Sequence, residues 1–193
     1  MSEINFYLNT GLSKAFKQMF QEIEDNLDTD VKIQAYLAGG MAIHFYTGYR
    51  ATGDIDVEFS HRLSLPDDLI VEAELENGDI RPLYIDKNYN STFALMHPDY
   101  QDDAISVPFD FKNFEVKVLS PVDMIVSKIA RMGANDKEDI RQIILLGLTT
   151  TEEIEQRATE ALDYFIGNVS HLKHNIAEVL EMSNTYSVKR FSM

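Results

Sequence analysis

Two glycines and two aspartates are the residues whose types and spacing best suit chemistry in this 193-residue sequence. Gly39 and Gly40 are followed, after thirteen intervening residues, by Asp54-Ile55-Asp56. In a β-strand, residues i and i+2 project from the same face, so both carboxylates would point the same way. Carboxylates this close repel each other unless a cation lies between them, and oxygen ligands of this kind suit Mg²⁺ or Mn²⁺. The pair therefore predicts a metal site.

The glycine pair is suited to binding a phosphate. It lies between an expected strand at Val31–Ala38 and an expected short helix at Met41–Tyr46. Glycines let the backbone approach an anion closely, and the first N–H groups of the helix would point at it. A bare Gly-Gly is more often a turn, and a bare Asp-x-Asp is more often a solvated strand end. In combination, the glycines and the acids predict a site for a metal-bound nucleoside triphosphate.

The hydrophobic pattern places this motif in an α/β sheet region. Apolar residues recur at intervals of three and four between Leu12 and Leu27, which predicts an amphipathic helix. Asp54–Phe59 alternates charged and apolar residues, as a half-buried strand does. Asn77-Gly78 predicts a tight hairpin turn between two apolar runs. Further strands are expected at Ile70–Leu75, Ile80–Ile85, Thr92–His97, Ala104–Val107 and Glu115–Leu119.

The chain is expected to be helical from Ser120 onward. Ser120-Pro121-Val122-Asp123 has an N-cap serine, a proline at the first helical position and an acid at the third. Another helix is expected from Asp136 to a stop at Gly147. Two more helices are expected at Glu152–Ile166 and Val169–Met182.

Composition and charge limit the classes of protein to which the chain can belong. Hydrophobic residues make up 45% and charged residues 25%, as in globular proteins, and the lack of cysteine excludes disulfides and thiolate metal sites. A formal net charge of -15 argues against non-specific nucleic-acid binding by the whole surface. No signal peptide or membrane-spanning run is visible, so a cytoplasmic location without membrane contact is expected. The expected domains are an α/β domain over residues 1–119 and a helical region over residues 120–193.

The whole motif resembles the DNA polymerase β-like nucleotidyltransferase superfamily, in which a Gly-Gly or Gly-Ser turn precedes Asp-x-Asp or Asp-x-Glu by about a dozen residues. Ala38–Ala42 and Arg50–Asp56 together are similar to the bacterial branch that includes the AbiEii-type toxins. In that branch a helix with Leu-Ser-Pro, an acid and a lysine precedes a Lys-Asp helix. The corresponding residues here are Leu119–Asp123, Lys128 and Asp136–Ile140.

The resemblance implies a fold and residue roles. The fold would be a mixed α/β (α+β) sheet flanked by helices and followed by a C-terminal helical bundle. Asp54 and Asp56 would ligate two Mg²⁺ ions, the glycines would bind the phosphates, Lys128 would contact the nucleotide, and Asp139 would be the downstream acid. Taken from the residues alone, Lys128 is equally an edge lysine beside an apolar stripe. Asp139 is equally half of a capping pair with Asp136.

A third carboxylate is less easily assigned. Polymerase-like enzymes usually add an acid from another strand to accept the proton of the attacking hydroxyl. The candidates are Glu74, Asp99, Asp102 and Asp110. We favour Asp99, just beyond the expected strand at Thr92–His97; the alternative, with Pro98 beside it, is a turn residue.

The expected activity is Mg²⁺-dependent transfer of a nucleoside monophosphate from a nucleoside triphosphate to a hydroxyl. The resemblance implies RNA, such as a tRNA end, or a protein as acceptor, and a cognate antitoxin as a partner. The alternative is a catalytically degenerate module of the same fold that binds a nucleotide or a partner. A third alternative is an interaction protein in which both motifs are coincidental. The active-site hypothesis requires Asp54 and Asp56 to face the Gly39-Gly40 turn.

Overall fold

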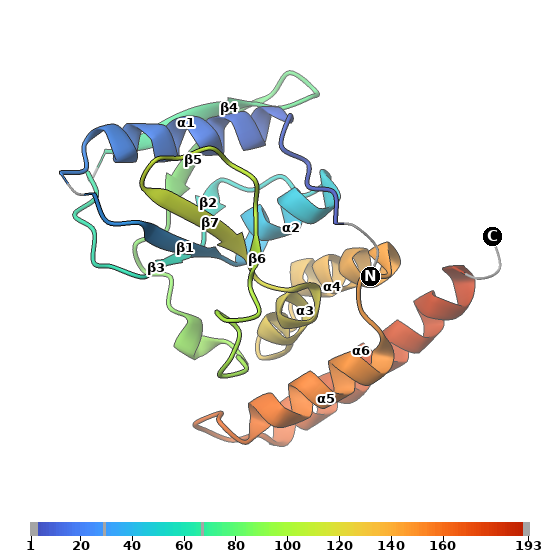
Figure 1. Ribbon diagram of the computed structural model, residues 1–193. Helices are drawn as coiled ribbons and strands as arrows, with labels where there is room; N and C mark the ends of the chain where they lie inside the picture. The colour runs from blue at the N-terminus through green and yellow to red at the C-terminus, as the bar shows by residue number, and fades with distance from the viewer. Residues whose placement is uncertain (1–3, 29, 67, 191–193) are drawn as a thin grey trace. The chain divides into compact units, whose positions relative to one another are not determined.

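The computed structural model describes residues 4–28, 30–66 and 68–190, and the chain divides into two compact units (Figure 1). The first, here called the sheet unit, comprises Asn5–Tyr89 and Ala104–Val118. The second, here called the helical unit, comprises Ile4, Asn90–Asp103 and the chain from Leu119 onward. The segment Asn90–Asp103 thus interrupts the sheet unit in sequence and packs with the helices.

The sheet unit contains two sheets that mix parallel and antiparallel pairs, which confirms the expected α/β (α+β) class. In one sheet, in the order β3-β1-β7-β6, β1 pairs antiparallel with β3 and parallel with β7. Its strands are β1 (Ile33–Leu37), β3 (Val57–Phe59), β6 (Ile105–Ser106) and β7 (Phe114–Val118). In the other, in the order β2-β5-β4, β5 pairs parallel with β2 and antiparallel with β4. Its strands are β2 (Asp54–Ile55), β4 (Ile70–Glu74) and β5 (Ile80–Ile85).

The strand predicted at Asp54–Phe59 is divided at Asp56, so that β2 and β3 belong to different sheets. The carbonyl of Ile55 accepts a hydrogen bond from Asp86 N at 3.0 Å, at the end of β5. The carbonyl of Asp56 instead accepts from Ala38 N at 2.9 Å, at the end of β1. Successive carbonyls on a strand point to opposite sides, which is why adjacent residues join different sheets.

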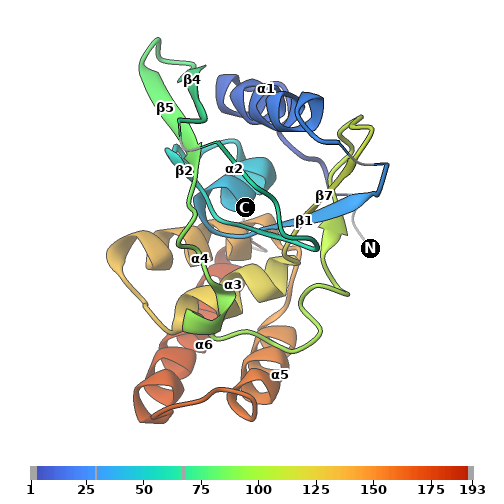
Figure 2. The ribbon, with the colours of Figure 1, turned by 90° about the vertical axis from the view of Figure 1, so that its left-hand side faces the viewer.

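Two helices complete the sheet unit. Helix α1 (Gly11–Asp25) has Thr10 as its N-cap and ends before Leu27, and it packs along the strands, closest to β4 (Figure 2). Its buried face carries Phe16 and Phe20, and the ring of Phe20 meets Phe114 of β7 edge-on at 5.1 Å. Helix α2 (Gly39–Thr47) begins at the glycine pair and ends at left-handed Gly48, with φ +65°. The glycine turn is therefore the N-terminus of a helix whose far end is buried in this core.

Four helices form the core of the helical unit. They are α3 (Pro121–Ile129), α4 (Ala134–Leu146), α5 (Thr151–Leu162) and α6 (Ser170–Arg190). The predicted Ser120 cap is confirmed, since its hydroxyl accepts from Asp123 N at 3.2 Å, and Gly147 ends α4 at φ +65°. Helix α4 begins two residues before Asp136, whose carboxylate is the capping group that accepts from Gly133 N. None of the described helices is long and apolar enough to cross a membrane.

The prediction of a strand at Thr92–His97 is wrong. Ser91–Phe93 forms a short 3-10 helix, η1, and no strand follows it before β6. The side chain of Asn90 accepts a hydrogen bond from Thr92 N at 2.9 Å. This local bond offers the backbone an alternative to a strand ladder, which is how asparagine favours turns. The strand expected at Ala104–Val107 is only two residues long, at Ile105–Ser106.

Candidate functional site

The glycine turn lies directly against the Asp56 carboxylate. Gly39 has φ +58°, and a Cβ added to it would lie 1.7 Å from Asp56 Oδ2. A side chain is therefore excluded twice, by the left-handed backbone and by the neighbouring carboxylate. The hydrogen bond from Ala38 N to the Asp56 carbonyl fixes this approach. As a result, an acidic oxygen lies beside the N-terminus of α2.

The second glycine is linked to Asp54 through Thr52. A Cβ added to Gly40 would lie 2.7 Å from Thr52 Oγ1, and the buried Thr52 hydroxyl donates a hydrogen bond to Asp54 Oδ1. Thr52 therefore fills the space beside Gly40 and orients the carboxylate at the same time. In this way the structure brings the two predicted glycines and the two predicted acids close together, Asp56 directly and Asp54 through Thr52. Their roles in binding and catalysis remain predictions.

The donor set at this turn fits a metal that arrives with its nucleotide. Asp54 and Asp56 are both partly accessible, and they offer oxygen ligands only. Among the residues that the structure describes, no group of three or more His, Asp or Glu side chains is placed to hold an ion. Mg²⁺ commonly uses one or two carboxylates and takes its other ligands from water and substrate phosphates. Asp54 and Asp56 would therefore hold the ion together with a triphosphate, because the described part of the chain supplies no further acid or histidine to complete a cage.

Asp86, which directly follows β5, was missed in the sequence, and its backbone bonds to the residue between Asp54 and Asp56. The register of the parallel pair β2–β5 places Asp54 beside Tyr84 and Ile55 beside Ile85, and Asp86 N then donates a hydrogen bond to the Ile55 carbonyl at 3.0 Å. In the structure, Asp86 Oδ1 accepts from Asn88 N at 2.8 Å. The sequence shows an acid immediately after a predicted strand, but it does not show that this strand pairs with β2.

Lys128 and Asp139 lie together in the helical unit. The Lys128 ammonium, in a side chain only 6% exposed, is 2.8 Å from Asp139 Oδ2 and 3.7 Å from Asp136 Oδ1. The edge-lysine interpretation is therefore wrong, since the charge is buried against two carboxylates. The capping carboxylate is that of Asp136, while Asp139 joins α4 to α3 through Lys128. Their assignment to nucleotide contact stays a prediction.

Two cations hold Asp136 in its charged form. Burial opposes ionisation of this carboxyl, but hydrogen bonds from Arg131 and Gly133 N, with the charge of Lys128, outweigh it and lower its pKa. Arg131 donates through both Nε and Nη2, at 2.7 and 2.6 Å. The acids of this cluster are thus neutralised by basic side chains of the protein itself.

Asp99, the favoured third acid, lies in a turn of the helical unit. Its side chain is 64% exposed, and its backbone N–H donates to Nδ1 of the buried His97 at 3.2 Å. The sheet unit, which contains Asp54 and Asp56, does not include it. The other candidates are exposed acids, with Glu74 on β4, Asp102 in the same turn as Asp99, and Asp110 in the segment before β7. The role of Asp99 stays a prediction.

His44, on α2, has a structural environment. It is buried, with Nε2 2.7 Å from Thr10 Oγ1 and Nδ1 2.7 Å from the Arg50 carbonyl. Burial lowers its pKa, against the opposing effect of the hydrogen bond to Arg50. Its ring thus joins the cap of α1, the helix α2 and the segment that leads to Asp54, and so supports the site without facing it.

Comparison with known protein families matches residues 14–187 to the family described as nucleotidyltransferase of unknown function (DUF6036). The matched stretch includes the glycine turn, the Asp54 and Asp56 pair, and the Lys128 cluster. A search of curated proteins found no match to the chain. Because the family match spans nearly the whole sequence, the chain belongs to this nucleotidyltransferase family.

Proposed function

We propose that the protein transfers a nucleoside monophosphate from a nucleoside triphosphate to a hydroxyl, at the site formed by Gly39-Gly40, Asp54 and Asp56. Membership of the family supports the reaction class. The observation that carries the proposal is the position of Asp56 Oδ2, against a glycine that no other residue can replace without a clash. This arrangement supports the proposal, because a carboxylate is a ligand suited to Mg²⁺ and the N-terminus of a helix favours phosphate.

Each part of the site has a distinct role in this proposal. The backbone N–H groups of Gly39 and Gly40 bind the phosphates, and Asp54 and Asp56 hold Mg²⁺ or Mn²⁺. Bound metal would neutralise the charge that develops on the phosphoryl oxygens. Thr52 holds Asp54 in position through its hydroxyl, so that the carboxylate need not reorganise when the substrate arrives.

The proton of the attacking hydroxyl needs an acceptor, and Asp86 is the candidate that the sheet favours. The hydrogen bond from Asp86 N to the Ile55 carbonyl supports it, since it brings the end of β5 beside the residue between Asp54 and Asp56. Asp99 remains the candidate from the sequence. Measuring the transfer activity of the Asp86→Ala and Asp99→Ala variants decides between them. A loss confined to Asp86→Ala assigns the role to Asp86, and a loss confined to Asp99→Ala assigns it to Asp99.

The acceptor and the biological setting follow from the resemblance to the AbiEii-type branch. The proposed acceptor is RNA, such as a tRNA end, or a protein side chain, and the proposed partner is an antitoxin that neutralises the activity. Lys128 and Asp139 would contact the nucleotide in this scheme. Co-purification of the chain with the product of a neighbouring gene would test the partner, and relief of growth inhibition by that product would test the toxin role.

The transfer experiment is direct. The purified chain is incubated with each of four α-labelled nucleoside triphosphates, Mg²⁺, and either total cell RNA or total cell protein. Label should enter one acceptor class with the wild type and be lost with Asp54→Ala and Asp56→Ala. Asp25→Ala, which removes an exposed acid on α1 in the same unit, is the matched control and should keep full activity. Equal labelling by wild type and the two site variants would contradict the proposal.

A second candidate function is nucleotide binding without turnover. It is favoured by the observation that no three acids converge among the described residues. Thermal unfolding separates the two functions. Stabilisation by a nucleoside triphosphate with Mg²⁺, in the absence of any labelled product, would favour the binding module.

A further inference from the structure

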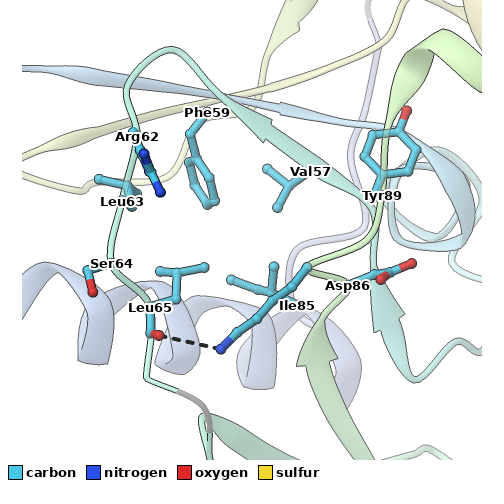
Figure 3. A pocket seen from close by; sticks show the side chains of 10 residues that line it. Val57, Phe59, Arg62, Leu63, Ser64, Leu65, Ile85, Asp86 and Tyr89 are labelled. Atoms are coloured by element: carbon cyan, nitrogen blue, oxygen red, sulfur yellow. Dashed lines mark hydrogen bonds between the residues drawn. The ribbon is translucent and has the colours of Figure 1, made fainter.

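The hairpin of β4 and β5 has one covered face and one open face. Helix α1 packs against the covered face, where Val71, Leu83 and Ile85 are buried (Figure 2). Ile85 also lies opposite Val57 across a hollow on this side of the strand (Figure 3). Strand residues alternate between faces, so six side chains project from the open face. This face, here called the outer face, consists of Ile70, Glu72 and Glu74 on β4 and Ile80, Pro82 and Tyr84 on β5.

Four of the six side chains of the outer face are apolar, although all six are exposed. Ile70 is 58% exposed, Ile80 is 64% exposed and Tyr84 is 46% exposed. They form a continuous strip, because Ile70 lies beside Tyr84 in the register and Pro82 lies between Tyr84 and Ile80 on β5. Single apolar residues on a surface are common, whereas a contiguous group commonly marks an interaction site. The strip therefore indicates a surface that a partner covers.

Acids border the strip. On β4, Glu72 lies opposite Pro82 and Glu74 lies opposite Ile80, so the outer face has two negative charges and no positive one. The turn between the strands, residues 76–79, adds two more acids. Nucleic acids bind where Lys and Arg neutralise their phosphates, so this face is unsuited to RNA. It is complementary instead to a protein segment with apolar side chains and with Lys or Arg.

The outer face leads to the proposed catalytic site. The register pairs Asp54 of β2 with Tyr84, and Tyr84 with Ile70, so these three residues form a row across the sheet. The Tyr84 ring also lies close to the residue before Asp54, since a Cβ added to Gly53 would be 4.0 Å from Tyr84 Cε1. A segment that covers the strip would therefore bring its own residues beside Asp54.

We propose that the acceptor of the transfer is a protein, and that a basic, apolar segment of it docks on the outer face. This inference rests on the proposed function. The docked segment brings a Ser, Thr or Tyr hydroxyl to the site. The hydroxyl oxygen forms a bond to the α-phosphorus, the bond from that phosphorus to the bridging oxygen of the β-phosphate breaks, and pyrophosphate leaves with the electron pair. The hydroxyl proton passes to a carboxylate of the site. A second copy of the chain, docked by the same face, would instead oppose like charges.

The acceptor class is tested by transfer. The full chain is incubated with α-labelled nucleoside triphosphates, Mg²⁺, and either total cell protein or total cell RNA. Label should enter protein. Two double variants of the outer face, Ile70→Thr/Ile80→Thr and Glu72→Lys/Glu74→Lys, should each lower this labelling about tenfold or more, because they remove apolar contact or reverse the charge. Their Mg²⁺-dependent binding of nucleoside triphosphate, measured by calorimetry, should match the wild type. Threonine suits a strand as isoleucine does, so the hairpin should stay folded.

A matched control changes the net charge equally outside the hairpin. Asp25→Lys/Asp28→Lys, at two exposed acids of the sheet unit, should keep full labelling. Label in RNA and not in protein, or labelling at the wild-type rate by both outer-face variants, would overturn the proposal. A dimer in gel filtration that Ile70→Thr/Ile80→Thr converts to a monomer would also overturn it, because a second copy would then occupy the face.

Docking is measured separately in EDTA without nucleotide, so that it does not depend on transferase activity. The probes are a fluorescent peptide of lysine, leucine and serine, the same peptide with glutamate in place of lysine, and a single-stranded RNA of equal length. In anisotropy measurements only the lysine peptide should bind, and both outer-face variants should weaken its binding. If the wild type labels neither protein nor RNA, the proposed function fails. If the lysine peptide does not bind, or the RNA binds more tightly, the docking surface fails.

Discussion

Each unit of the molecule contains a pair of aspartates close together, and the two pairs are held in different ways. In the helical unit, Asp136 and Asp139 are buried and are paired with the cations Lys128 and Arg131. In the sheet unit, Asp54 is partly accessible and accepts from a neutral hydroxyl, that of Thr52. In the helical unit, therefore, basic side chains of the fold itself neutralise the charges of the two aspartates.

The difference separates acids that hold the fold together from acids that are available to a ligand. A buried carboxylate needs a cation or several donors to remain charged, and the Asp136 cluster has both. The Asp54 and Asp56 pair has instead a glycine turn beside it and a hydroxyl that fixes its geometry. Such a pair is open to an external cation. The two pairs should therefore respond in opposite ways when they are mutated, in activity for one and in stability for the other.

The largest expected effect is on activity in the sheet unit. Asp54→Asn or Asp56→Asn should lower transfer by about a thousandfold or more, or roughly 4 kcal/mol of transition-state stabilisation. The thermal midpoint of unfolding should stay the same or rise, because the substitution removes repulsion between like charges. Initial rates and thermal unfolding of the same preparations measure both. A lower thermal midpoint with unchanged specific activity would contradict the assignment of this pair to activity and not to stability.

The next effect is on stability in the helical unit. Asp139→Ala should lower the free energy of unfolding by about 3–5 kcal/mol, because it leaves the Lys128 ammonium buried without its closest partner. Urea unfolding monitored by circular dichroism measures this loss.

A double variant, Lys128→Met with Asp139→Leu, sharpens the same test. Replacing both charges by apolar groups of similar size should restore most of the stability. If transfer is retained in this folded double variant, the pair is structural. If transfer is lost while stability is restored, the nucleotide-contact role implied by the resemblance is supported.

A smaller effect is expected from Gly39→Ala, which should cost about 1–3 kcal/mol of folding stability. Two causes contribute, the positive φ angle and the collision with Asp56 Oδ2. An Asp56→Ala background removes the collision with Oδ2 and leaves the positive φ angle with a tight contact of 3.1 Å to the Cβ of residue 56, so a double-mutant cycle should show a coupling of at least about 0.5 kcal/mol. Additive costs would mean that the carboxylate and the turn are not in contact.

The smallest expected effect is a difference in pH response. The pKa of His44 is lowered from its ordinary value of 6.5, so the unfolded chain takes up this proton first. Stability from the neutral ring is present above about pH 6.5 and is lost as the pH falls below it. Asp136, whose pKa is lowered from 3.8, loses its contribution only below that value. The free energy of unfolding, measured in urea, should fall between about pH 7.5 and pH 5.5, and His44→Gln should reduce that fall. An unchanged drop would exclude His44 as its cause.

The sequence predicted those parts of the fold and site that depend on neighbouring residues. The glycine turn, the Asn77-Gly78 hairpin, the Ser120 cap and the Gly147 stop each follow from the conformational preferences of one or two residues. The meeting of Gly39 and Asp56 was also expected, because a known motif carries that long-range information.

Features that depend on pairing between distant segments could not be predicted. The division of Asp54–Phe59 at Asp56 follows from its successive carbonyls, which accept hydrogen bonds from Asp86 N at the end of β5 and from Ala38 N at the end of β1. The burial of Lys128 depends on how α3 meets α4, which the apolar stripe of α3 alone does not fix. The strand prediction at Thr92–His97 was wrong for a local reason, because the hydrogen bond from Thr92 N to the Asn90 side chain favours a turn there.

The most direct test of the central claim is calorimetric titration of the wild type and of Asp54→Asn/Asp56→Asn with each nucleoside triphosphate, with Mg²⁺ and with EDTA. We predict that at least one nucleoside triphosphate binds the wild type only when Mg²⁺ is present, and that the double variant loses this metal-dependent binding while remaining folded. Metal-dependent binding of equal strength in both proteins, or no triphosphate binding by the wild type, would contradict the assignment of Gly39-Gly40, Asp54 and Asp56 as a metal–triphosphate site.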